Sequence, residues 1–274
     1  MKTLPVALQV YSIREEAAKD FKKAMQTVKE IGYDGVELAG LYDIPAKEIK
    51  AILDEVGLVP VSAHVSEIMN GGKDLEEVLD DYVTIGVKYI AVPYLGEGMR
   101  PGDEGFDEVL KKIEAAGIAA RKKGMTLLYH NHDFEFIKMP DGTYGLDYMY
   151  ANTAPENLQT ELDTCWVNVG GENPADYVRK YTGRAPVVHL KDFEGSKSEQ
   201  MYELIGIKTE KKEEVKNTFR FRPVGSGKQD FPAILAAAVD AGAQWVVVEQ
   251  DQWYDTPALE CAKMSREYLK SLGW

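Results

Sequence analysis

The sequence has few cysteines, no long apolar segment and fewer basic than acidic residues. Its two cysteines, Cys165 and Cys261, offer neither a CxxC pair nor a disulfide framework, so we expect small buried side chains rather than thiol chemistry. No apolar run approaches the length of a membrane span, and the opening MKTLPVALQV lacks the long apolar core of a signal peptide. These absences predict a cytoplasmic protein without a membrane partner.

The charge balance argues against a nucleic-acid partner. Lys and Arg number 32 against 45 Asp and Glu, which gives a formal net charge of −13 and a pI near 4.9. A surface that binds phosphates needs clustered Lys and Arg side chains. We therefore expect a small-molecule ligand, whereas a homo-oligomer is left open.

The chain is long enough to bury a substantial core. Its 274 residues, 45% of them hydrophobic, suit one large α/β domain or two small ones. No linker rich in Pro, Gly and Ser divides it, so we expect a single domain over residues 1–274.

One unit recurs along the chain: an amphipathic helix, a glycine and then a short β-branched strand, as in FKKAMQTVKEIGYDGVEL. The glycines fall where a helix C-cap needs a left-handed residue, at Gly32, Gly57, Gly86, Gly124 and Gly242. Strands alternating with helices indicate βαβ units and a parallel sheet.

Eight strands are expected, at residues 5–10, 34–38, 58–64, 88–93, 125–132, 158–163, 186–191 and 244–249. This number predicts an α/β fold closed as a (β/α)8 TIM barrel, with elaborated loops at its C-terminal rim. A doubly wound open sheet is the alternative. It needs a Gly-rich turn after the first strand, where this chain reads QVYSIREE.

Reactive side chains gather at the ends of these strands, where parallel barrels place their active sites. The last four strands bring forward a candidate metal set of His130, Asp163, His189 and Glu249. Two imidazoles and two carboxylates favour Mn²⁺, Zn²⁺, Co²⁺ or Fe²⁺ over Mg²⁺. The alternative is four separate hydrogen-bonded residues, and the sequence leaves open whether His130 or His132 is the ligand.

Strand alternation predicts which neighbours share the barrel interior with that set. His132 is expected above His130, Lys191 above His189 and Glu161 below Asp163, whereas Asn131 points outward. These positions make His132, Glu161 and Lys191 candidate catalytic groups for moving protons. Glu161 could also orient the metal ligands, and its alternative is a buried ion pair without a catalytic role. Lys191 could also polarise a substrate oxygen, and its alternative is a solvated rim residue.

The opposite wall offers candidates for binding substrate. Gln9, Glu37 and His64 end the first three strands, and Trp166 and Trp253 follow the sixth and eighth. Glu37 and His64 could bind hydroxyl groups or move protons from the far side of a substrate, and an aromatic ring could stack on a sugar. Structural hydrogen bonds and core packing are the alternatives.

Two long loops, 133–145 and 193–222, are expected to cover the rim, and the DG in the first suggests a hairpin. The GSGK at 225–228 lacks the spacing of a nucleotide-binding P-loop, although its backbone could still approach a phosphate or a hydroxyl.

Taken together, eight segments resemble the xylose-isomerase-like TIM-barrel superfamily, in particular its sugar phosphate isomerase/epimerase branch, which includes inosose dehydratases. The segments are LQVYSIR, GYDGVELAG, SAH, YHNHDFEF, ELDTCW, HLKD, PVGSGKQDF and VEQD. The resemblance implies one divalent metal ion held by Glu, Asp, His and Glu, and Asp163, His189 and Glu249 match the last three. His130 replaces the first glutamate, which puts a symmetrical two-glutamate epimerase mechanism in doubt.

The resemblance also implies an enzyme that enolises a keto sugar or keto polyol, the metal stabilising the enediolate. Isomerisation, epimerisation, or dehydratase or lyase chemistry on an inosose or 3-keto sugar would then differ only in the fate of that intermediate. A DNA-repair endonuclease for abasic sites, or a barrel that only binds sugar, are the remaining alternatives. The first is disfavoured by four histidines and the net charge of −13.

Overall fold

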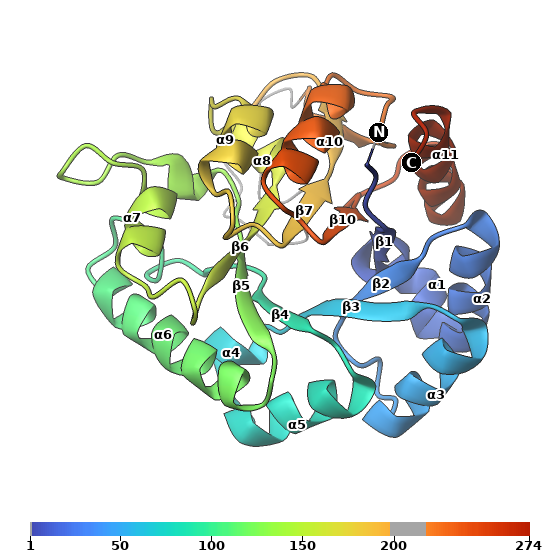
Figure 1. Cartoon of the computed structure of the whole chain (residues 1–274), viewed down its shortest axis with the longest axis horizontal. Coiled ribbons are helices and arrows are strands. Elements are labelled where there is room, and N and C mark those ends of the chain that lie inside the picture. The colour runs from blue at the N-terminus through green and yellow to red at the C-terminus, as the bar shows by residue number, and fades with distance from the viewer. Residues whose placement is uncertain (1, 198–217) are drawn as a thin grey trace.

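The computed structural model describes residues 2–197 and 218–274, which form a closed barrel of parallel strands surrounded by helices (Figure 1). Around the barrel the strands follow the order β1-β10-β7-β6-β5-β4-β3-β2, so each lies beside its neighbours in the chain. The barrel strands are β1 (Val6–Gln9), β2 (Gly35–Ala39), β3 (Val59–His64), β4 (Tyr89–Val92), β5 (Thr126–His130), β6 (Gln159–Asp163), β7 (Val187–Leu190) and β10 (Trp245–Val248).

Helices form the outer layer, and the last of them, α11, packs against α2 and η1, close to the N-terminus (Figure 1). The α-helices are α1 (Arg14–Lys19), α2 (Phe21–Ile31), α3 (Ala46–Val56), α4 (Glu67–Asn70), α5 (Leu75–Ile85), α6 (Phe106–Lys122), α7 (Gly145–Ala151), α8 (Thr164–Val169), α9 (Pro174–Lys180), α10 (Phe231–Asp240) and α11 (Ala258–Ser271). Two 3₁₀ helices, η1 (Val10–Ile13) and η2 (Phe134–Phe136), follow strands. Among the described residues, no helix is both long and apolar enough to cross a membrane.

The barrel predicted from the sequence is confirmed, and the open sheet is excluded because β1 pairs with both β2 and β10. Each predicted strand coincides with a barrel strand to within two residues at either end. The largest difference is at β5, which ends at His130, so Asn131 and His132 lie in the loop that follows.

Local sequence explains where the helices begin and end. Asp20 and Asp74 accept hydrogen bonds from backbone N–H groups in the first turns of α2 and α5. At the other end of α2, Gly32 adopts a φ of 103° and its N–H closes onto Lys29 and Val28. The helix-Gly-strand unit therefore reflects the conformation required at each turn into a strand.

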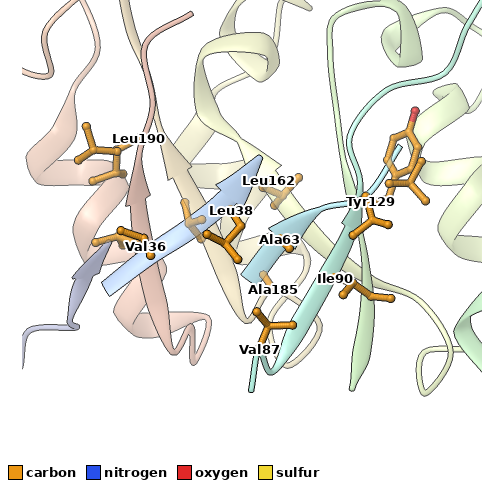
Figure 2. Packing of buried hydrophobic residues seen from close by; sticks show 14 of the residues in the cluster. Val36, Leu38, Ala63, Val87, Ile90, Tyr129, Leu162, Ala185 and Leu190 are labelled. Atoms are coloured by element: carbon orange, nitrogen blue, oxygen red, sulfur yellow. The ribbon is translucent and has the colours of Figure 1, made fainter. Parts of the chain in front are cut away.

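The barrel wall separates two apolar cores. Outward-facing strand residues such as Val36, Leu38 and Leu162 pack beneath the helices, as Figure 2 shows. A smaller cluster fills the barrel interior with Ala7, Val61, Tyr89, Ala91, Leu128, Val187 and Val247. Two residues further toward the C-terminal ends of most strands, the inward-facing side chains are polar. This layer of polar side chains is the floor of the candidate site.

The loop predicted at 193–222 contains a short antiparallel pair, β8 (Asp192–Glu194) with β9 (Arg220–Arg222). Residues 198–217 of this loop lie outside the described residues, so its expected position over the rim stays a prediction. In the other long loop, an antiparallel bridge between Lys138 and Tyr144 encloses the DG turn, as expected of a hairpin.

Candidate active site

A ring of polar side chains lines the upper part of the barrel interior. Although all are ionisable or strongly polar, most are withdrawn from solvent: Gln9, Glu37, His130, Glu161, Asp163, His189, Lys191 and Glu249 are each at most 4% exposed. Buried charges are costly unless they are paired or bind an ion. Their concentration at the strand ends therefore marks a functional site.

Four of these residues form a group able to hold a cation. One ligand atom from each of His130, Asp163, His189 and Glu249 lies within 4.8 Å of all the others. His130 Nε2 is 3.6 Å from Asp163 Oδ2, and His189 Nδ1 is 2.9 Å from Glu249 Oε2. Asp163 Oδ2 is buried and accepts no hydrogen bond from the backbone, whereas Oδ1 accepts from Cys165 N and Trp166 N. Two imidazole nitrogens and two carboxylate oxygens fit a divalent transition-metal ion.

Glu161 lies below that group and contacts three histidines. Its Oε1 is 2.7 Å from His64 Nε2, 3.1 Å from His130 Nδ1 and 3.2 Å from His189 Nε2. His130 and His189 thus turn one ring nitrogen toward Asp163 or Glu249 and the other toward Glu161. Glu161 and the three histidines form a second group whose ligand atoms lie within 4.8 Å of one another.

Glu37 completes the floor from the opposite side of the barrel. Its Oε1 accepts from Gln9 Nε2 at 2.6 Å and lies 2.9 Å from His189 Nε2, while Ser62 donates to its other oxygen. A register shift between β2 and β3 places Ser62 beside Glu37. Burial opposes charge on Glu37, yet His189 and His64 outweigh it and hold its pKa well below the usual range.

The same charges act on the histidines in return. Burial disfavours an imidazolium at His64, but Glu37 and Glu161 overcome this and raise the pKa of His64 to about 10. The pKa of His189 is likewise raised, against burial, by these two carboxylates. His130 differs, because burial and the neighbouring cationic groups both lower its pKa.

Lys191 extends upward from β7 into a cage of carboxylates. Its Nζ lies 3.1 Å from Asp163 Oδ2, 3.0 Å from Glu249 Oε2 and 2.9 Å from Asp251 Oδ2. Burial would neutralise the amine, but these anions raise the pKa of Lys191 well above its usual value. Burial raises the pKa of Asp251 to about 7, with Lys191 opposing the shift.

The loop after β5 presents His132 from an aromatic setting. Its ring stacks on Phe134 at a centroid distance of 5.5 Å and meets Tyr94 edge-on at 5.2 Å. Burial first, and the Lys191 charge second, lower the pKa of His132. Glu135 anchors this loop by accepting from His132 N at 2.8 Å and Tyr129 Oη at 2.6 Å, and burial raises its pKa to about 8.

Strand alternation predicts that Asn131 points outward into the helix layer, but the structure places its side chain against the end of the neighbouring strand, β6. Asn131 lies just past β5, where its side chain accepts from Asp163 N at 2.9 Å and donates to Asp163 O at 3.3 Å. This reciprocal pair joins the end of β5 to the end of β6. It thereby holds His130 and Asp163 in one layer.

A cavity of about 580 Å³ opens above the ring, at the C-terminal ends of the strands. Among the predicted site residues it is bordered by His64, His130, His132, Lys191 and Glu249. The predicted residues that lie beneath this surface are Gln9, Glu37, Glu161, Asp163 and His189. The structure therefore separates residues able to touch a ligand from those that support them.

The two tryptophans predicted to stack on a sugar do not border this cavity. Trp166 is fully buried, and Lys191 Nζ lies 5.6 Å from its ring centroid. Trp253 packs against the guanidinium of Arg14 at 4.6 Å. Trp166 reaches the cavity lining through Lys191 and through the His132 ring, whose centroid lies 5.3 Å from its own.

The backbone of the GSGK segment binds a carboxylate of the chain itself. Asp192 Oδ2 accepts from Gly225 N at 3.0 Å and Gly227 N at 2.8 Å, and Oδ1 accepts from Phe193 N and Gln229 N. The N–H groups that could approach a phosphate are thus already engaged. Because Asp192 follows Lys191 directly, this loop also fixes the backbone from which Lys191 extends.

Comparison with known proteins agrees with this geometry. The model of the xylose isomerase-like TIM barrel family matches residues 25–272. The chain belongs to this family. Among curated relatives, the inosose dehydratase of Clostridium beijerinckii is 27% identical over 280 residues, covering 91% of this chain and 89% of the relative. The inosose dehydratase of Lacticaseibacillus casei is 24% identical over 279 residues, covering 91% and 88%.

Solved structures share the fold. A sugar phosphate isomerase/epimerase from Parabacteroides distasonis superposes with a TM-score of 0.78 at 23% identity, covering 99% of this chain and 95% of that one. The 3-keto-D-glucoside 4-epimerase of E. coli superposes with a TM-score of 0.67 at 18% identity, covering 98% and 99%. The resemblance read from the sequence is confirmed, and the chain is an enzyme of the isomerase, epimerase or dehydratase type.

Two residues of this xylose isomerase-like barrel were not among the predicted site residues. Asp251 stands two positions after Glu249, so the alternation that relates Lys191 to His189 also signals Asp251. Glu135 lies among aromatic residues in HNHDFEF, and no sequence signal distinguishes it from an exposed loop carboxylate. Its contacts depend on how the loop folds back.

Proposed function

We propose that this enzyme removes the proton next to the carbonyl of a keto sugar or keto polyol, with a divalent ion in the site. The observation that supports this best is the group formed by His130, Asp163, His189 and Glu249, which is buried and whose ligand atoms converge within 4.8 Å. A bound ion would supply Lewis-acid polarisation of the substrate carbonyl. Mn²⁺, Zn²⁺, Co²⁺ or Fe²⁺ suits this donor set better than Mg²⁺.

Direct proton transfer belongs to residues that border the cavity. His132 and Lys191 approach a substrate from the β5 and β7 side, and His64 from the β3 side. Their placement on two sides of one cavity suits the removal of a proton by one group and its return by another. Return at a different carbon gives an isomer, and return on the other face gives an epimer.

Glu161 has a different part in this proposal, because it lies below the cavity surface. Its oxygen contacts the ring nitrogens of His130 and His189 that face away from the metal group. Such a carboxylate fixes the tautomer and orientation of metal-binding imidazoles. Glu161 communicates with the cavity through His64, at 2.7 Å.

The charges around the cavity favour a substrate without a phosphate group. Among the described residues that border it, Lys191 is the only Lys or Arg side chain, and it already contacts three carboxylates. Glu67, Glu249 and Asp251 contribute negative charge to the same surface. The Gly225–Gly227 backbone is engaged by Asp192. An uncharged sugar or polyol is therefore the better fit.

Dehydration is the second candidate outcome, and the curated relatives favour it. Inosose dehydratases match this chain over 91% of its length. Loss of a β-hydroxyl from the intermediate formed by the first proton removal would give an unsaturated product. Lys191 and His132 are the cavity residues that could protonate the departing hydroxyl.

The test combines metal content with proton exchange. Protein purified without chelator should carry about one equivalent of Mn, Co, Zn or Fe by mass spectrometry, and His189→Ala should lose it. Unphosphorylated keto sugars and inososes, and their phosphate esters, should then be incubated with the loaded enzyme in D₂O. Deuterium next to the carbonyl of an uncharged compound is the expected result, and an ultraviolet-absorbing enone would identify dehydration.

Two results would contradict the proposal. Failure of the wild-type protein to bind any of these ions, even after incubation, would remove the metal site. Metal binding without exchange in any compound would leave a cation-binding barrel with no enolisation activity. Glu156→Gln, at an exposed position far from the cavity lining, is the control for purification and loading.

A further inference from the structure

Lys191 contacts the oxygens that a metal ion would need. Its Nζ lies 3.1 Å from Asp163 Oδ2 and 3.0 Å from Glu249 Oε2. These are the oxygens that face the imidazoles, with His130 Nε2 at 3.6 and 3.9 Å from them. The ammonium therefore neutralises the two carboxylates of the candidate metal group.

An ammonium and a divalent ion cannot share two carboxylate oxygens without strong repulsion. Lys191 cannot move into solvent easily, because its side chain is only 1% exposed. The rings of Trp166 and Phe221 lie 5.6 and 5.5 Å from Nζ and add a favourable cation–π environment. The charge must accordingly stay inside the cavity when an ion binds.

Asp251 offers the charge a partner that the metal group does not use. Its Oδ2 lies 2.9 Å from Lys191 Nζ. Asp251 borders the cavity and lies outside both groups of converging ligand atoms. It is thus placed to retain the ammonium beside the substrate.

We propose that the Lys191 ammonium competes internally with the divalent ion, and that Asp251 is the positioning residue that holds Lys191 in the cavity once the ion takes Asp163 and Glu249. This inference rests on the proposed metal site. Lys191 weakens metal binding, whereas Asp251 limits that weakening and keeps the ammonium, a proton donor, beside the substrate. Asp251 acts on the reaction through Lys191.

The first test measures the dissociation constant for Mn²⁺ by calorimetry at one pH, on protein freed of metal with a chelator. Lys191→Met should bind Mn²⁺ roughly tenfold more tightly than wild type, because the competing charge is gone. Lys191→Gln should do the same, which guards against a folding defect in one variant. Lys111→Met, on the exposed surface of α6, matches the change in net charge and should leave the constant unchanged.

Asp251→Asn should weaken Mn²⁺ binding, because Lys191 then has no other carboxylate to contact. The loss should be several-fold larger in the wild-type background than in Lys191→Met, which a double-mutant cycle measures. Asp251→Glu should restore most of the affinity. In a crystal structure with Mn²⁺, Lys191 Nζ should keep its contact with Asp251 and should no longer contact Asp163 or Glu249.

The outcomes separate this inference from the proposed function. Wild-type protein that binds no Mn²⁺ would overturn both. One equivalent of Mn²⁺ in wild type, with no gain in affinity in either Lys191 variant, would overturn only the competition. An equal effect of Asp251→Asn with and without Lys191 would refute the positioning role of Asp251.

Discussion

Glu161 reaches the cavity through His64, whose Nε2 lies 2.7 Å from Glu161 Oε1. His64 borders the cavity, and Glu161 is fully buried below it. The carboxylate is therefore a supporting group in this geometry, and its removal should first disturb the imidazoles around it.

Glu161→Gln should lower the affinity for Mn²⁺ by roughly ten- to a hundredfold, because His130 and His189 lose the anion that orients them. Titration calorimetry on metal-free protein measures the effect. Glu156→Gln, an exposed glutamate, provides the matched control. Unchanged metal affinity combined with lost activity would instead make Glu161 part of the proton path through His64.

His130 and His132 should respond differently to replacement by phenylalanine. His130→Phe should abolish tight Mn²⁺ binding, because this imidazole belongs to the converging group. His132→Phe should retain the metal, since the ring already packs among Phe134, Tyr94 and Trp166, while kcat falls by roughly 10²–10⁴. Metal content and deuterium exchange on the same preparations decide between them. Loss of metal in His132→Phe alone would reverse the assignment.

Glu135 should make stability depend on pH. Its pKa is raised by burial to about 8 from an ordinary 4.5, so the folded state holds this proton more tightly than the unfolded state. The stabilisation is fully present below pH 4.5 and is lost as the pH rises through 8. Between these values the wild type should lose up to about 1.4 kcal/mol per pH unit relative to Glu135→Gln.

Urea unfolding of the two proteins at pH 5, 6.5 and 8, with a chelator present, measures this difference. Taking the difference between variants removes the contribution of the other buried groups. Glu48→Gln, on the exposed face of α3, should show the pH dependence of the wild type. Parallel curves for wild type and Glu135→Gln would show that Glu135 is ionised in the folded protein at pH 5.

Gly227→Ala should destabilise the protein by about 1–3 kcal/mol. A Cβ at this position would collide with the Asp192 carboxylate and with the carbonyl oxygen of Phe193. Gly96→Ala is the control, because its Cβ would meet only the flexible end of Met99. Urea midpoints compare the two variants. Equal midpoints would mean that the loop opens without cost, and its N–H groups would then be available to a phosphate.

Several features of the site follow from sequence pattern alone. Strand position and alternation depend only on neighbouring residues, because parallel strands end at one rim and side chains alternate at every step. The pattern therefore predicted the barrel and the convergence of His130, Asp163, His189 and Glu249. It also predicted Lys191 directed toward the cavity. The roles of these residues remain predictions.

Other features required the tertiary structure, because they depend on contacts between segments distant in the chain. Whether Trp166 faces a ligand or the core depends on β9, which supplies Phe221 against it. Whether GSGK binds a phosphate depends on Asp192, more than thirty residues earlier, which occupies its N–H groups. Which nitrogen of His130 faces Asp163 and Glu249 depends on Glu161 from the next strand. Local sequence determines where each side chain starts, and packing across the barrel decides what it contacts.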